Sequence, residues 1–279
     1  MKEKLIDYLK IKDKNFIKEV LVQFIKEEFH KAGFKKAVIG ISGGVDSALA
    51  AFLGVLALGK ENVIGISMPY RTSSKASIED ARLVAEVLGI EFYEIDITPQ
   101  IDAYYRNFKD ADRLRRGNKM ARERMSILYD FAQWKKALVL GTSNKSELLI
   151  GYSTRWGDGA HDINPLGDLY KTQVLEMASF LGIPERIVKK KPSADLWQGQ
   201  TDEGEIGLSY HLLDQILVGY VEFRLKEEEL VKLGFERKTV KKVLTLVKRS
   251  QYKRKLPIIC KISHRTVDKG FLYLRDWGL

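Results

Sequence analysis

The pattern of hydrophobic and polar residues changes several times along this chain, and each change marks a predicted element. Apolar residues recur every three or four positions over residues 15–29, as they do on one face of an amphipathic helix. A short apolar run follows at 36–41 and ends in a glycine-rich turn, after which residues 45–58 again have helical composition. This order predicts a strand, a glycine loop and a helix in succession.

The same alternation continues as far as residue 140. Apolar runs at 62–68, 91–95 and 137–140 are short enough to be strands, and helical patterns cover 77–88 and 118–134. Strands separated by helices are usually joined by right-handed crossovers into a parallel sheet. We therefore predict a doubly wound α/β fold, a parallel sheet with helices on both faces, with further helical segments at the N- and C-termini.

The second half of the chain combines helical patterns with long polar connections. Glycine and aspartate are frequent over 151–168, which is expected to be a loop, and the polar connection at 189–204 is long for a compact domain. Helical patterns occur at 171–181, 205–218, 227–233 and 238–248. No internal repeat or interdomain linker is visible, so a single domain over residues 1–279 is expected.

Composition and charge narrow the function classes. The formal net charge of +10 favours an anionic partner, which could be a nucleic acid, a membrane surface or a polyphosphate nucleotide. Cys260 is the only cysteine, which excludes an intrachain disulfide and a CxxC pair and fits a reducing, cytoplasmic setting. No run approaches the roughly 18 apolar residues of a membrane span, and the N-terminus lacks a signal-type apolar core. A cytoplasmic protein without membrane association is expected.

The glycine loop is the first candidate for chemistry. It reads Gly40, Ile41, Ser42, Gly43, Gly44, Val45, Asp46 and Ser47. It lies where a predicted strand meets a helix, the position at which open α/β sheets bind ligands. Glycines let backbone amides approach an anion, and the helix N-terminus favours phosphate. The loop is neither a Walker A nor a GxGxxG sequence.

The loop resembles the SGGxDS signature of the pyrophosphatase-loop ATPases, which cleave ATP between the α- and β-phosphates and transfer AMP. The resemblance implies an adenine nucleotide alpha hydrolase-like fold. Ser42 and Ser47 could donate hydrogen bonds to pyrophosphate, and Asp46 could hold Mg²⁺ against its oxygens. The alternative is a tight turn in which Asp46 caps a helix.

The second half of the chain narrows the choice within this superfamily. The segments GTSNKSE at 141–147 and GYSTRWGDGAHDINPLGDLYKT at 151–172 closely resemble the signature of the NAD synthetases. Further similar segments are GNKMARERM at 117–125, KKKPSADL at 189–196 and DEGEIGLSYHLLD at 202–214. The motifs occur in order over nearly the whole chain. The chain therefore resembles the ammonia-dependent NAD synthetase family.

The resemblance implies roles for individual residues. ATP contacts would be Gly40, Ile41, Ser42, Gly43, Gly44, Val45, Asp46, Ser47, Thr142, Lys171 and Ser193. Contacts to deamido-NAD would be Arg122, Arg155, Asp162, Tyr252 and Lys253. Catalytic residues would be Asp46, Glu147, Asp162 and Lys171, of which Asp46 and Glu147 would bind Mg²⁺. Outside the motif context, Glu147, Arg122 and Lys171 could each be a solvated surface charge.

Three positions differ from the family pattern. Arg155 replaces a usual Lys and changes the geometry of the donor, whereas Ser193 replaces Thr and keeps a hydroxyl. The pair Tyr252 and Lys253 replaces His and Lys, so an imidazole is lost. The assignment of Tyr252 therefore depends most on the structure.

The implied reaction has two steps. The carboxylate of deamido-NAD attacks the α-phosphate of ATP and releases pyrophosphate, and ammonia then displaces AMP from the acyl-adenylate. Positioning and charge stabilisation suffice for this, so no nucleophile is required and Cys260 is interpreted as structural. Asp162 could hold ammonium near the adenylate. The polar segments 71–75 and 189–205 are expected to close over the intermediate.

The resemblance also implies a nitrogen source and an assembly. A glutamine-hydrolysing module would need its own Cys, Glu and Lys, and this chain has no room for one, so free ammonia or a separate amidase is expected. A homodimer with deamido-NAD near the subunit interface is implied. The apolar stripe over 20–29 could belong to that interface, or to the core.

Two alternatives remain at this point. The runner-up is a tRNA-modifying pyrophosphatase-loop enzyme, although its sulfur-transfer members generally need catalytic cysteines and its lysidine-type members lack the GDGAHD segment. A nucleotide sensor without turnover is the other, but it would not need both Asp46 and Glu147. The basic runs at 189–191 and 253–255 could contact phosphate or be solvated surface, and no nucleic-acid partner is expected.

Overall fold

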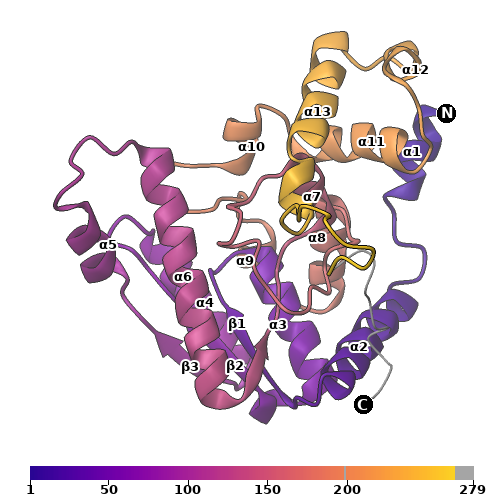
Figure 1. Cartoon of the computed structure of the whole chain (residues 1–279). Helices are drawn as coiled ribbons and strands as arrows, with labels where there is room; N and C mark the ends of the chain where they lie inside the picture. Colours follow the sequence, from indigo (N-terminus) through magenta and orange to yellow (C-terminus); the bar gives the residue numbers. More distant parts are fainter. Residues whose placement is uncertain (198, 268–279) are drawn as a thin grey trace.

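A parallel sheet lies at the centre of the molecule, as predicted. The computed structural model describes residues 1–197 and 199–267, so residue 198 and residues 268–279 of the predicted domain lie outside the described part. The strands are β1 (Lys36–Gly40), β2 (Val63–Ser67), β3 (Glu91–Glu94) and β4 (Ala137–Val139). They pair in the order β3-β2-β1-β4, all parallel (Figure 1). In this register Val38 lies opposite both Ile64 and Val139.

Helices pack on both faces of the sheet, which confirms the doubly wound α/β prediction. On one face lie α2 (Lys14–Lys31), α3 (Val45–Leu58), α4 (Lys75–Leu88), α8 (Lys171–Phe180) and α9 (Glu185–Val188). On the other lie α5 (Thr98–Tyr105) and α6 (Arg113–Lys135). Alternate residues of β1 point to opposite faces of the sheet. Ala37 and Ile39 pack in the first core, on the face with α3, and Val38 packs in the second core, on the face with α6.

A third core is built mainly from helices. It joins α1 (Lys2–Tyr8), α7 (Lys145–Ile150), α10 (Asp202–Ile206), α11 (Tyr210–Val221), α12 (Glu227–Lys232) and α13 (Arg237–Arg249). In Figure 1, α1, α11, α12 and α13 lie together at the upper right, and α7 lies below them beside α8. Leu5 of α1 and Leu217 of α11 are fully buried in it, so the N-terminal helix shares a core with helices from the later part of the chain. The prediction of terminal helical segments is confirmed.

The prediction of one helix over 205–218 was wrong. The structure has α10 and α11 there, separated by Gly207, whose φ of +71° is a left-handed conformation that ends α10. Ser209 then starts α11 by accepting a hydrogen bond from Leu212 N at 3.3 Å. Glycine followed by a capping serine therefore outweighed the continuous apolar pattern.

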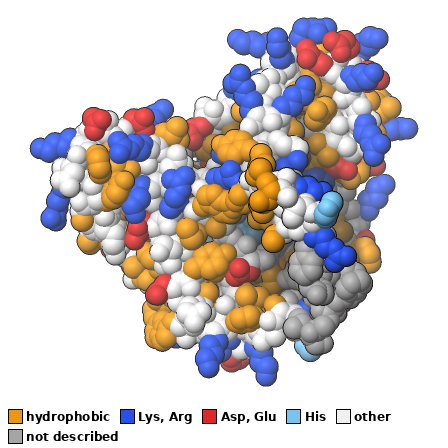
Figure 2. All heavy atoms as spheres, viewed as in Figure 1, with side chains coloured by type: hydrophobic (Ala, Val, Ile, Leu, Met, Phe, Trp, Pro, Cys, Tyr) orange, Lys and Arg blue, Asp and Glu red, His pale blue; other side chains and the backbone are white. Residues whose placement is uncertain are grey.

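The stripe over 20–29 divides between core and surface. Ile25 and Phe29 are buried in the first core, whereas Val20 and Phe24 are 47% and 39% exposed. Among the described residues no helix combines the length and apolar character that crossing a membrane requires. On the face drawn in Figure 2, lysine and arginine side chains are spread over several elements with acidic residues among them, and do not form one patch.

Candidate active site

A cavity of about 530 Å³ lies at the carboxyl ends of the strands. Its walls are the loop after β1, residues 66–69 at the end of β2, and residues 139–143 at the end of β4. Residues 190–197 line another side. Open α/β sheets bind their ligands at this edge, and cavities of roughly 300–1,000 Å³ accommodate small molecules.

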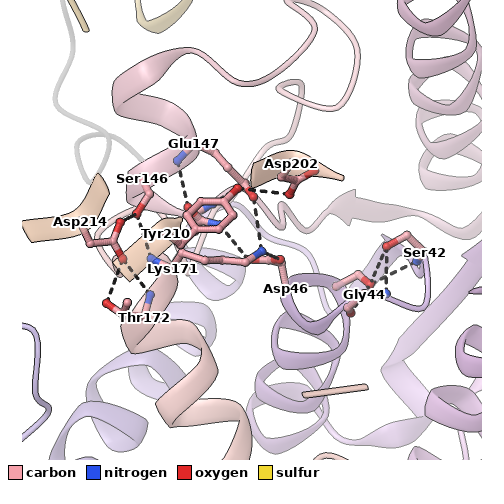
Figure 3. Close-up of polar contacts among 12 residues, drawn as sticks. Ser42, Gly44, Asp46, Ser146, Glu147, Lys171, Thr172, Asp202, Tyr210 and Asp214 are labelled. Atoms are coloured by element: carbon pink, nitrogen blue, oxygen red, sulfur yellow. Dashed lines mark hydrogen bonds and ion pairs between the residues drawn. The ribbon is translucent and has the colours of Figure 1, made fainter. Parts of the chain in front are cut away.

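The glycine loop has the backbone that its sequence requires. Gly43 has φ +75°, and a Cβ built there would lie 2.2 Å from the carbonyl oxygen of Ser77, so no other residue fits without movement. Ser42 N donates to Ser47 Oγ at 3.2 Å, and Gly44 N donates to Ser42 Oγ at 3.3 Å (Figure 3). These bonds shape the loop around the start of α3.

The start of α3 is suited to an anion. Its N-cap is Gly44, which provides no side-chain cap, and the residues from Gly44 to Ser47 line the cavity. Asp46 does not cap the helix, because its two oxygens bind Asn144 Nδ2, at 2.8 Å, and Lys171 Nζ. The alternative in which Asp46 is only a helix cap is therefore wrong.

Three helices bring a charged centre together beside this loop. Asp46 comes from α3, Glu147 from α7 and Lys171 from α8. Lys171 Nζ forms a hydrogen-bonded ion pair with Asp46 and lies 3.6 Å from Glu147 Oε1 (Figure 3). Lys171 is 1% exposed. The interpretation of Lys171 as a surface lysine is wrong, and Glu147 likewise faces the cavity rather than solvent.

Asn144 connects the two carboxylates of this centre. Its side-chain amide donates to Asp46, and its Oδ1 accepts a hydrogen bond from Glu147 N at 3.0 Å. Glu147 Oε2 in turn accepts from Asn144 N at 3.3 Å, which completes a capping box at the start of α7. The sequence GTSNKSE thus places Glu147 through local helix-capping chemistry.

Burial and the neighbouring carboxylate change the proton affinities here. Burial, with Asp46 as the next largest cause, raises the pKa of Glu147 to about 8. Burial alone would lower the pKa of Lys171, but the carboxylates of Asp46 and Glu147 outweigh it and raise that pKa. A further cation bound at this centre would compete with the proton on Glu147 and favour its carboxylate form.

The donor set fits Mg²⁺ if a ligand supplies the remaining oxygens. Asp46 and Glu147 offer the hard carboxylate oxygens that Mg²⁺ prefers, and Mg²⁺ commonly binds one or two carboxylates together with phosphate and water. No group of three or more His, Cys, Asp or Glu side chains with metal-binding geometry occurs in the described ranges. The residues therefore suit a cation that arrives with, or is completed by, a polyphosphate.

Most of the predicted ATP contacts line the cavity. These residues are Gly40, Ile41, Ser42, Gly44, Val45, Asp46, Ser47, Thr142, Lys171 and Ser193. Gly43 is in the loop but does not itself line the cavity. Ser193 Oγ donates to Gln200 O at 2.7 Å and accepts from Asp195 N at 3.0 Å, so it also shapes its own segment.

Of the predicted deamido-NAD contacts, Lys253 alone lines the cavity. Arg122, Arg155 and Tyr252 form a neighbouring group, in which Arg122 Nε donates to Arg155 O at 3.3 Å and the Arg155 guanidinium lies 5.5 Å from the centre of the Tyr252 ring. Asp162 stands apart, since its carboxylate accepts from Val139 N at 2.7 Å and Tyr129 OH at 3.2 Å. The structure does not bring Asp162 to the charged centre.

The cavity is also lined by acidic residues that no prediction named, among them Asp202 and Asp158. Asp202 is 4% exposed, and its Oδ2 accepts from Tyr210 OH at 3.2 Å, while Oδ1 has no hydrogen-bond partner within residues 1–197 and 199–267. Asp158 accepts from Thr154 N at 2.7 Å. Burial raises the pKa of both carboxyl groups. Both lie in quoted motifs, GDGAHD and DEGE, which is the signal that could have identified them.

The two segments expected to close over the intermediate contact each other. Ser74 N donates to Asp195 Oδ2 at 2.9 Å, and Thr72 Oγ1 donates to Leu196 O at 3.4 Å. Lys190, from the same second segment, donates to Asp80 Oδ2 at 2.9 Å and to Gly43 O at 3.3 Å. This segment is therefore tied to the glycine loop, and its closure stays a prediction.

A parallel sheet with a glycine loop at its carboxyl edge and a buried acidic centre beside it defines a nucleotide-binding α/β protein. The family model described as NAD synthase matches residues 17–257. A relative from Trichlorobacter lovleyi, named NH(3)-dependent NAD(+) synthetase, is 52% identical over 262 residues, covering 94% of this chain and 96% of the relative. The chain belongs to the NAD synthase family.

Solved structures agree with this assignment. An NMN synthetase from Francisella tularensis has a TM-score of 0.81 and 35% identity, over 90% of this chain and 99% of that one. An NH3-dependent NAD synthetase from Campylobacter jejuni, in complex with the nitrate ion, has a TM-score of 0.77 and 34% identity, over 90% of this chain and all of that one. The adenine nucleotide alpha hydrolase-like fold is confirmed, and the tRNA-modifying alternative is not favoured.

Proposed function

We propose that this chain is a ligase that converts the carboxylate of deamido-NAD into the carboxamide of NAD, using ATP and ammonia and releasing AMP and pyrophosphate. The observation that carries the proposal is the Asp46–Lys171–Glu147 centre beside the glycine loop, in a chain of this family. Relatives named NH(3)-dependent NAD(+) synthetase are about half identical and are matched over 96% of their length. The reaction is the last step in making NAD.

The chemistry follows from the weakness of a carboxylate as an acyl donor. An oxygen of the substrate carboxylate bonds to the α-phosphorus of ATP while the bond to the bridging oxygen breaks and pyrophosphate leaves. Ammonia then attacks the acyl carbon, loses a proton to a base, and AMP leaves with the former carboxylate oxygen. The protein has to position the two substrates and stabilise charge.

Each part of the centre has a proposed task in the first step. The loop from Gly40 to Ser47 and the N-terminus of α3 bind the departing pyrophosphate. Lys171 neutralises the charge that develops on the α-phosphate, since its ammonium is buried and held beside the loop. Asp46 and Glu147 would hold Mg²⁺, which when bound supplies positive charge to the phosphates.

Deamido-NAD is proposed to extend from the cavity over Lys253 to the neighbouring Arg122, Arg155 and Tyr252. Arg122, Arg155 and Tyr252 contact one another outside the cavity, which supports a substrate that extends beyond it. We therefore propose a homodimer with the substrate near the interface. The exposed apolar side chains of α2 offer a surface for such contact. Asp162, also outside the cavity, is kept as a substrate contact.

The remaining expectations are consistent with this function. One synthetase domain over 1–279 using free ammonia is supported by the high coverage of the ammonia-dependent relatives. A cytoplasmic location is supported by the single cysteine, Cys260. A second candidate substrate is nicotinic acid mononucleotide, because a structure with a TM-score of 0.81 is named as an NMN synthetase.

The test is an assay of the purified chain with ATP, Mg²⁺ and ammonium, in which either deamido-NAD or nicotinic acid mononucleotide is the acceptor. NAD and stoichiometric AMP from deamido-NAD are the expected products. Amidation of the mononucleotide alone would select the second candidate, and AMP without either amide would point to another acceptor. Glutamine in place of ammonium should give no product, and omission of Mg²⁺ should stop the reaction.

A further inference from the structure

Asp214 is a buried acidic residue that has no part in the function proposed above. It lies in the middle of α11 and is 0% exposed. Its Oδ1 accepts a hydrogen bond from Ser146 Oγ at 2.5 Å, and its Oδ2 accepts from both Thr172 N and Thr172 Oγ1 at 2.9 Å (Figure 3). A carboxylate this deeply buried is costly unless its oxygens are satisfied, and here three donors satisfy them.

The donors belong to the first turns of the two helices that carry the charged centre. Ser146 precedes Glu147 in α7, and Thr172 follows Lys171 in α8. Ser146 Oγ also accepts a hydrogen bond from Lys171 N at 2.9 Å, so a single network joins both helix starts. Both hydrogen-bond partners of Asp214 are therefore chain neighbours of the two charged groups, Ser146 of Glu147 and Thr172 of Lys171.

This network determines where the two groups point. Lys171 Nζ lies 3.6 Å from Glu147 Oε1 only if α7 and α8 begin at fixed positions relative to each other. Asp214 supplies that constraint from a third helix, since it holds the starts of both. Misplacement of a reacting or charge-stabilising group by about 1 Å can cost about a hundredfold in rate.

From these contacts we infer that Asp214 is a positioning residue for the adenylation centre, which it serves by holding Glu147 and Lys171 in register through Ser146 and Thr172. The inference rests on the proposed function for the identity of the reaction. It concerns only the residues of this chain and does not require Asp214 to touch a substrate. A structural role in the helical core alone would predict lower stability with unchanged catalysis.

The main test replaces Asp214 with asparagine, which keeps the shape but offers one acceptor oxygen to three donors. The kcat of Asp214→Asn should fall by about 10- to 100-fold, as is typical when outer residues that orient a site are changed. The KM for deamido-NAD should change by less than about threefold, because the residues proposed to bind it lie elsewhere. Leu217→Ala is the matched control, since Leu217 is also fully buried on α11. It should lower Tm and keep kcat.

A second pair of variants works from the donor side, in case Asp214→Asn does not fold. Thr172→Val removes the hydroxyl donor and keeps the branched shape, whereas Thr172→Ser keeps the hydroxyl. We expect Thr172→Val to lower kcat by about tenfold, the loss of one hydrogen bond to a charged group, and Thr172→Ser to retain wild-type kcat. Equal loss in both variants would mean that packing matters and would overturn the inference.

A binding measurement separates this inference from the proposed function. If the wild type forms no amide from either acceptor, the proposed function fails. Calorimetric titration with MgATP then decides the inference, because Lys171 faces the same cavity as the glycine loop. An ATP affinity of Thr172→Val at least about threefold below that of Thr172→Ser would support positioning of the centre. Equal affinities in that case would overturn the inference. If the wild type is active, a folded Asp214→Asn protein with wild-type kcat would also overturn it.

Discussion

Replacing Lys171 with methionine removes the ammonium between Asp46 and Glu147 while keeping the length of the side chain. The Lys171 side chain is 2% exposed, and the side chains of Asp46 and Glu147 are 18% and 16% exposed. Their charges are therefore largely out of water. Without the ammonium, Asp46 retains the hydrogen bond from Asn144 as compensation.

The expected cost follows from this burial. Removing one partner of a buried ion pair destabilises a protein by about 3–5 kcal/mol. The lower end, about 3 kcal/mol, applies here because Asp46 keeps one donor and some exposure. For a chain of this size Tm should fall by about 6–12 °C. Turnover should fall by about 100-fold or more, because a preorganised charge beside the phosphates is lost.

The assay is thermal unfolding without nucleotide near neutral pH, followed by steady-state turnover below the unfolding range. The companion variants are Asp46→Asn and the double variant. Once Asp46 has no charge, Lys171→Met should cost less, so the two effects on Tm should not add. A Tm for Lys171→Met within about 2 °C of wild type, or strictly additive effects, would refute this account of the centre.

Three further predictions concern other positions. Gly43→Ala should lower Tm and raise the KM for ATP, because a left-handed φ costs a non-glycine residue about 1–2 kcal/mol and the new Cβ meets Ser77 O; an unchanged KM would contradict this. Burial lowers the pKa of His161, so the stability present above its unfolded pKa of about 6.5 is lost as pH falls. When the pH is lowered from about 7.5 to about 5.5, the Tm of His161→Gln should therefore fall less than that of the wild type. An equal fall would argue against a role of His161 in the pH dependence. Cys260→Ser should keep kcat within about twofold, as Cys260 is exposed and no thiol is required; inactivation would refute that interpretation.

Local features of the structure were accessible from the sequence because they depend on neighbouring residues. The strand, loop and helix over 36–58 follow from an apolar run, glycines that permit a left-handed φ, and renewed helical periodicity. The same locality explains the error at Gly207, where an apolar pattern continued through a helix end. Periodicity reports which face is buried, whereas a break depends on a single backbone conformation.

Only part of the candidate site could be predicted from the sequence. Motif resemblance identified Asp46, Glu147 and Lys171, and the structure brings these three together. Their environment could not be predicted, since Asp202 and Asp214 come close to them through the folding of distant segments and not through sequence spacing. The local sequence also does not reveal that Asp162 lies outside the cavity, because a change of a few residues in a loop is enough to turn its side chain another way.

By itself the sequence determined the parallel α/β class, the phosphate-type loop from Gly40 to Ser47 and the family of the chain. Only the tertiary structure decided that Lys171, which is 125 residues from Asp46, is buried against it, and that Asp214 on α11 joins the helices behind them. Propensity and capping act over a few residues. Ion pairs and buried hydrogen bonds depend on which distant segments share one core, and that is settled when the three cores of this protein pack together.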